Sequence, residues 1–121
     1  MNPKKECKKL INSFKYAIQG FISSFKTERN MRIHILAMVL VIILGIIYEL
    51  NRIEWCICIF AIVLVISSEL FNTAIESIVD IISPQKNEKA KIVKDISAAA
   101  VLVFAIGSAI VGLIIFLPKI L

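Results

Sequence analysis

Four polar residues recur at helical spacing directly after an uncharged apolar run, and three of them are carboxylates. We call this set the acidic ladder: Glu69, Asn72, Glu76 and Asp80. The spacing i, i+3, i+7 and i+11 places them within roughly 80° of one face of an α-helix. Carboxylates beside a bilayer are costly unless they bind cations, pair with bases or do chemistry, and three on one face repel one another. The ladder therefore indicates a metal ion together with a polyanionic ligand.

Basic residues after the ladder extend this interpretation to phosphate chemistry. Lys94 follows a basic loop, and a lysine ammonium is a point charge that suits phosphate. Magnesium takes one or two carboxylates and completes its shell with water and phosphate oxygens, while another carboxylate can act as general base on an alcohol. No P-loop, HRD or DFG signature is present, which argues against a soluble kinase fold. Carboxylates paired with loop lysines in a channel or scaffold remain an alternative.

The composition is that of a membrane protein, with 59% hydrophobic residues in 121. Three uncharged runs occur, and a soluble chain this short could hardly bury them all. We therefore predict an all-α integral membrane protein, a single domain over residues 1–121. Its membrane helices are expected at about 31–50, 54–82 and 94–118. The second would be about 43 Å long against a hydrocarbon core of about 30 Å, so its ladder should extend into the cytoplasmic headgroup region.

The distribution of lysine and arginine predicts the orientation. Eight of the fourteen precede the first span and four lie between the second and third. By the positive-inside rule, we expect the N-terminus, the 83–95 loop and the ladder on the cytoplasmic side of a membrane that the chain crosses three times. The net charge of +5 then describes a basic rim suited to anionic lipids and phosphates, and no nucleic-acid partner is expected.

The segment from about residue 5 to residue 27 has an amphipathic pattern, which predicts a helix lying in the membrane interface. Tyr16 faces away from the apolar stripe and is free to meet a polar ligand, although a solvated tyrosine fits the pattern equally well. The lone His34 lies near a membrane boundary and is interpreted as an interfacial residue. The three cysteines form no CxxC or zinc pattern.

The ladder segment, ELFNTAIESIVD over 69–80, is followed by Lys94-Asp95 and AAAVL over 98–102. This combination resembles the prokaryotic diacylglycerol kinase family of small integral-membrane lipid kinases. TERN over 27–30 and FLPK over 116–119 resemble its Gram-positive branch, whose members typically phosphorylate undecaprenol. The resemblance implies ATP- and Mg²⁺-dependent phosphorylation of a membrane lipid alcohol. Undecaprenol is the expected substrate and diacylglycerol the alternative.

The resemblance also implies residue roles. Glu69 matches the general base on the lipid hydroxyl, and Glu28 and Glu76 match the magnesium ligands that hold ATP. The remaining matches are nucleotide contacts at Lys9, Tyr16, Gln85, Lys86, Asn87, Lys94 and Asp95, and supporting or substrate-binding residues at Asn72, Asp80 and Ala98.

The family works as a homotrimer with shared sites, so we expect the N-terminal helix of one subunit to cover the ladder of its neighbour. The rival interpretation is a non-catalytic, cation-binding membrane protein. Glu28 and Lys94-Asp95 argue against it, because a carrier has no need of a nucleotide-side lysine at this boundary.

Overall fold

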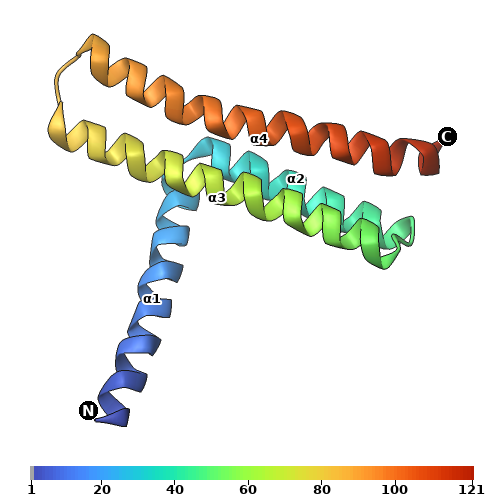
Figure 1. Cartoon of the computed structure of the whole chain (residues 1–121), viewed down its shortest axis with the longest axis horizontal. Coiled ribbons are helices and arrows are strands. Elements are labelled where there is room, and N and C mark those ends of the chain that lie inside the picture. The colour runs from blue at the N-terminus through green and yellow to red at the C-terminus, as the bar shows by residue number, and fades with distance from the viewer. Residues whose placement is uncertain (1) are drawn as a thin grey trace.

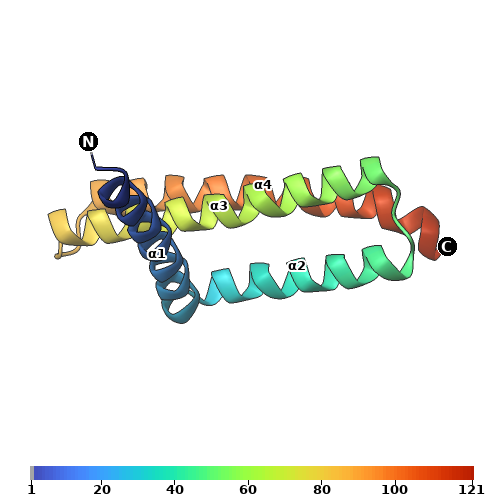
Figure 2. The ribbon, with the colours of Figure 1, turned by 90° about the horizontal axis from the view of Figure 1, so that it is seen from below.

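The computed structural model describes residues 2–121 and consists of four helices. Helix α1 (Pro3–Thr27) projects away from a bundle formed by α2 (Arg29–Ile47), α3 (Arg52–Ile82) and α4 (Glu88–Ile120) (Figures 1 and 2). The three bundle helices run antiparallel to their chain neighbours, and each is long and apolar enough to cross a membrane. The prediction of an all-α protein with three membrane-spanning helices is confirmed.

Helices α3 and α4 are longer than a membrane requires. Their 31 and 33 residues correspond to about 46 and 50 Å, against about 30 Å of hydrocarbon. Both extend past the start of α2 on the side where they are joined (Figures 1 and 2). This joined end therefore projects from the three-helix part of the bundle, and it carries the last turns of the ladder.

Helix α4 begins earlier than the sequence suggested, at Glu88 rather than near residue 94. Its N-cap is Asn87, whose side-chain oxygen accepts hydrogen bonds from the backbone N–H groups of Lys89 and Ala90 at 2.8 and 3.3 Å. An asparagine in this position satisfies helix donors that would otherwise lack partners. Lys94 and Asp95 consequently lie inside a helix rather than at its start.

The opposite end of the bundle is tightly packed. The turn between α2 and α3 carries Glu49 at a φ of 51°, and α3 begins with a capping box between Asn51 and Glu54. Lys119 Nζ lies 3.2 Å from Glu54 Oε2 and ties α4 to this turn. A Cβ at position 45 would lie 2.6 Å from Cη2 of Trp55, so any larger residue than glycine requires the indole ring or the backbone to shift.

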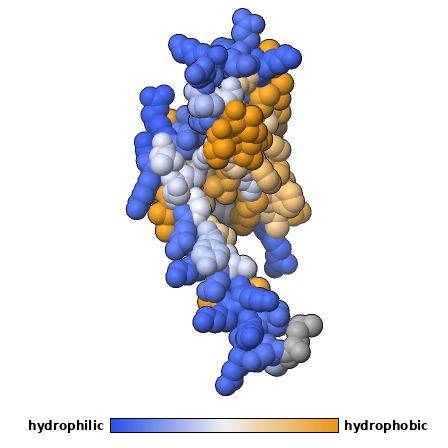
Figure 3. All heavy atoms as spheres, turned by 90° about the vertical axis from the view of Figure 1, so that its left-hand side faces the viewer, coloured by the Kyte–Doolittle hydropathy of each residue, from blue (hydrophilic) through white to orange (hydrophobic). Residues whose placement is uncertain are grey.

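The buried core is small and lies near this turn, around Leu50, Cys58, Ile115 and Phe116. Many other apolar side chains are exposed along all three bundle helices, as expected of surfaces that face lipid or another subunit. Figure 3 views the molecule from the joined end of α3 and α4. Hydrophilic side chains gather at its top, down its left side and along α1 at its bottom, and apolar side chains cover the right-hand flank.

Candidate active site

The acidic ladder passes from complete burial to solvent along α3. Glu69 has 0% exposure, and Asn72 is also buried. Glu76 is half-buried one turn further on, and the side chain of Asp80 is 64% exposed. The predicted common face therefore exists, but its members occupy very different environments. Only Glu69 holds its carboxylate away from solvent.

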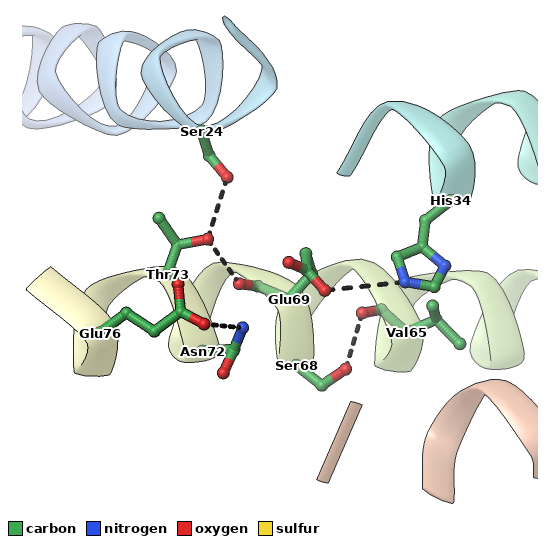
Figure 4. Close-up of polar contacts among 8 residues, drawn as sticks. All are labelled: Ser24, His34, Val65, Ser68, Glu69, Asn72, Thr73 and Glu76. Atoms are coloured by element: carbon green, nitrogen blue, oxygen red, sulfur yellow. Dashed lines mark hydrogen bonds and ion pairs between the residues drawn. The ribbon is translucent and has the colours of Figure 1, made fainter. Parts of the chain in front are cut away.

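The Glu69 carboxylate lacks hydrogen-bond partners within the described chain, since neither Oε1 nor Oε2 has one. The nearest basic group is His34 of α2, whose Nε2 lies 3.6 Å from Oε2 (Figure 4). That separation is too long for a hydrogen bond. An unpaired buried carboxylate is costly, so it marks a position where a substrate or another donor is expected.

The contact with His34 was not foreseen from the sequence, which suggested only an interfacial residue. The imidazole side chain is 18% exposed and points from α2 toward the ladder (Figure 4). Helical periodicity assigns residues to faces of one helix and says nothing about the register between two helices. The available signal was a lone histidine two turns after Glu28.

A chain of hydroxyl contacts holds the end of α1 against the ladder. The Ser24 and Thr73 hydroxyl oxygens lie 3.4 Å apart, and Thr73 donates to the backbone carbonyl of Glu69 at 3.0 Å (Figure 4). Ser24 is buried by this contact. Glu28 follows as the residue between α1 and α2 and is half-buried. Glu28 therefore directly follows the end of α1 that contacts the ladder helix.

Asn72 links two members of this group. Its Nδ2 donates to Oε1 of Glu76 at 3.2 Å (Figure 4), while its own Oδ1 is buried without a partner. The amide therefore orients one carboxylate and retains a free acceptor. The supporting role that the family resemblance implies for Asn72 stays a prediction.

The outer part of the ladder meets basic residues of α4. Lys94 donates to Asp80, and Lys91 Nζ lies 2.7 Å from Asp95 Oδ2. An open hollow of ≈ 540 Å³ lies beside these pairs, and its polar lining includes Asp80, Gln85, Lys86, Asn87, Lys91 and Lys94. Most of the predicted nucleotide contacts thus gather in one solvent-facing place.

Three predicted residues are not brought to this place within one chain. Lys9 and Tyr16 are exposed on α1, which extends away from the bundle (Figure 1), and Lys9 Nζ lies 3.8 Å from Glu6 Oε1. Ala98 is exposed on α4. A single chain therefore supplies the ladder, Glu28 and the α4 lysines but leaves the site open on one side.

The donor set fits a magnesium ion held jointly with phosphate. Across residues 2–121, no three His, Cys, Asp or Glu side chains are grouped closely enough to hold a metal by themselves. Glu28 and Glu76 nevertheless offer the one or two carboxylates that magnesium takes when phosphate oxygens and water complete its shell. The residues present match a metal that arrives with a polyphosphate.

These features define a class of protein, namely a small multi-pass membrane protein whose acidic ladder and neighbouring α4 lysines lie at one end of the helix bundle. Comparison with known proteins places the chain within that class. Residues 15–116 match the family model described as prokaryotic diacylglycerol kinase. The chain therefore belongs to the prokaryotic diacylglycerol kinase family and is a lipid kinase of the membrane.

Curated relatives agree with this assignment. The undecaprenol kinase of Bacillus subtilis is 44% identical over 116 residues, which cover 96% of this chain and 94% of the relative. The diacylglycerol kinase of a Synechocystis species is 42% identical over 93% of this chain and 65% of its own length. That of Haemophilus influenzae is 35% identical over 78% of this chain and 80% of the relative.

Proposed function

We propose that this lipid kinase phosphorylates undecaprenol, using ATP and Mg²⁺, to form undecaprenyl phosphate. The observation that carries the chemical part is the buried, unpartnered carboxylate of Glu69, set beside two further carboxylates at the boundary of the spanning bundle. The choice of lipid rests on the Bacillus subtilis relative, whose name is undecaprenol kinase and which aligns over almost the whole of both chains.

Glu69 acts as the general base in this proposal. Its carboxylate takes the proton of the lipid hydroxyl as the hydroxyl oxygen forms a bond to the γ-phosphorus of ATP. The bond from that phosphorus to the β,γ-bridging oxygen breaks, and ADP leaves with the electron pair. Burial suits the base to this task, because a carboxylate shielded from water remains available for the single alcohol that reaches it.

Glu28 and Glu76 would hold the magnesium ion, which neutralises charge on the ATP phosphates when bound. Asn72 supports Glu76 through its amide hydrogen bond. On the solvent side, Lys94 and Asp95 would contact the nucleotide. The 85–87 loop lines the same hollow as Lys94, which supports its inclusion in the nucleotide site.

Assembly as a homotrimer would complete the site. Helix α1 leaves its own bundle, carries exposed apolar side chains such as Phe14 and Ile18, and is rich in lysine. We infer that α1 lies in the cytoplasmic interface of the bacterial cell membrane, where apolar side chains enter the headgroup region and lysines meet anionic lipid. In this position Lys9 and Tyr16 reach the ladder of a neighbouring subunit and close its open side.

The proposed substrate is tested with purified protein in one detergent, with γ-labelled ATP and either undecaprenol or diacylglycerol at equal surface concentration. We expect label in undecaprenol at a kcat/KM well above that for diacylglycerol, and transfer by Glu69→Gln that is slower by about 10²-fold or more. A preference for diacylglycerol would overturn the substrate choice and leave the base assignment standing. Transfer to neither lipid would overturn the proposed function.

A further inference from the structure

His34 is the one basic side chain within 4 Å of the Glu69 carboxylate in the described part of the chain. It lies on α2, whereas the four ladder residues lie on α3 and Glu28 lies between α1 and α2. The family assignment explains the ladder and the α4 lysines. It leaves open why a histidine faces a buried carboxylate that has no hydrogen-bond partner.

The other donors close to the ladder are already engaged. Lys94 donates to Asp80. The guanidinium of Arg32 donates to the carbonyls of Phe25 and Lys26 at 2.9 and 3.0 Å. The Asn72 amide donates to Glu76. The His34 imidazole, by contrast, faces the Glu69 carboxylate, with its Nε2 3.6 Å from Oε2.

The surroundings of His34 also direct its ring toward Glu69. The residue lines a cavity of ≈ 280 Å³ between α2, α3 and α4, and nearly all the other lining side chains are apolar. The exception is Ser108, whose hydroxyl already donates to the Ala61 carbonyl at 3.4 Å. A ring N–H placed among such groups gains most by bonding to the one carboxylate beside it.

We propose that His34 is a positioning residue for the general base: its Nε2–H donates to Oε2 of Glu69 and leaves Oε1 to meet the lipid hydroxyl. This inference rests on the proposed function of Glu69. The present separation of 3.6 Å closes to a hydrogen bond by a small side-chain rotation, and catalytic contacts are commonly long before substrate binds. Fixing one oxygen selects the rotamer in which the other oxygen faces the substrate.

The test uses two replacements at position 34. Each is made in the wild-type protein and in the Glu69→Gln variant. His34→Leu removes the donor, and His34→Gln keeps an N–H at a similar reach. We expect His34→Leu to lower kcat by about 10- to 100-fold, the loss of one hydrogen bond to a charged group. The KM for MgATP should stay within about twofold, and His34→Gln should recover most of the turnover.

The Glu69→Gln background separates positioning from a structural role. There, His34→Leu should lower the residual rate by less than about threefold, because the group that it positions is already gone. The matched control is Ile33→Leu, an exposed neighbour on α2, which should behave as wild type.

Three results would overturn the inference while wild type stays active. They are equal losses in His34→Leu and His34→Gln, a loss confined to the KM for MgATP, or an undiminished loss in the Glu69→Gln background. Wild type that transfers no phosphate to either lipid alcohol would overturn the proposed function itself and this inference with it.

Discussion

Replacing Glu69 by glutamine should separate activity from stability. The side chain is completely buried, and neither carboxylate oxygen has a hydrogen-bond partner. Glutamine has the same length and shape but cannot accept the proton of the lipid hydroxyl. We expect turnover to fall by about 10²-fold or more, the usual contribution of a general base, with MgATP binding largely retained.

The same substitution should leave the fold as stable as wild type or more so. A charge buried without partners opposes folding, and its removal relieves a cost of the order of 1–3 kcal/mol. The measurements are labelled-phosphate transfer and unfolding of the detergent-solubilised protein monitored by circular dichroism. Near-normal turnover in an intact, folded Glu69→Gln protein would refute the assignment of the base. A marked loss of stability would refute the claim that the buried carboxylate destabilises the folded state.

Three further predictions concern metal binding, assembly and packing. Replacing Glu28 or Glu76 by alanine should raise the magnesium concentration needed for half-maximal activity and should also weaken ATP binding. In the double variant these losses should be strongly non-additive. If the losses of the two single variants simply add in the double variant, the two residues serve separate tasks. Mixed trimers of Glu69→Gln and Tyr16→Ala chains should recover a substantial fraction of activity if α1 serves the neighbouring ladder. Continued inactivity despite measured subunit exchange would exclude a shared site. Gly45→Ala should lower the free energy of unfolding by about 1–3 kcal/mol, because the new methyl group overlaps the Trp55 ring. An unchanged unfolding transition would show that the ring moves aside without loss of stability.

The sequence predicted the elements of the fold because their signals are local. Long apolar runs require spanning helices, and helical spacing was sufficient to gather Glu69, Asn72, Glu76 and Asp80 on one face. The sequence predicts a start of the third span near residue 94, because the charged residues before it are typical of a loop, whereas α4 begins at Glu88. Asn87 followed by Glu88 was an available helix-start signal.

The environment of each site residue could not be predicted in the same way. Burial of Glu69 and exposure of Asp80 depend on where α2 begins beside α3, and the contact of His34 with Glu69 depends on the register between those helices. These are tertiary properties with no periodic signature in the chain. Lys9 and Tyr16 are exposed on α1, so their roles as nucleotide contacts stay predictions.

The most direct test of the account measures ATP turnover by the wild-type protein in liposomes, with and without undecaprenol. We expect ADP release to require both the lipid alcohol and Mg²⁺, with one ADP for each undecaprenyl phosphate formed. ADP release that does not depend on the lipid alcohol would contradict coupled phosphate transfer, and undecaprenol that remains unphosphorylated while ATP is bound would contradict undecaprenol as the substrate.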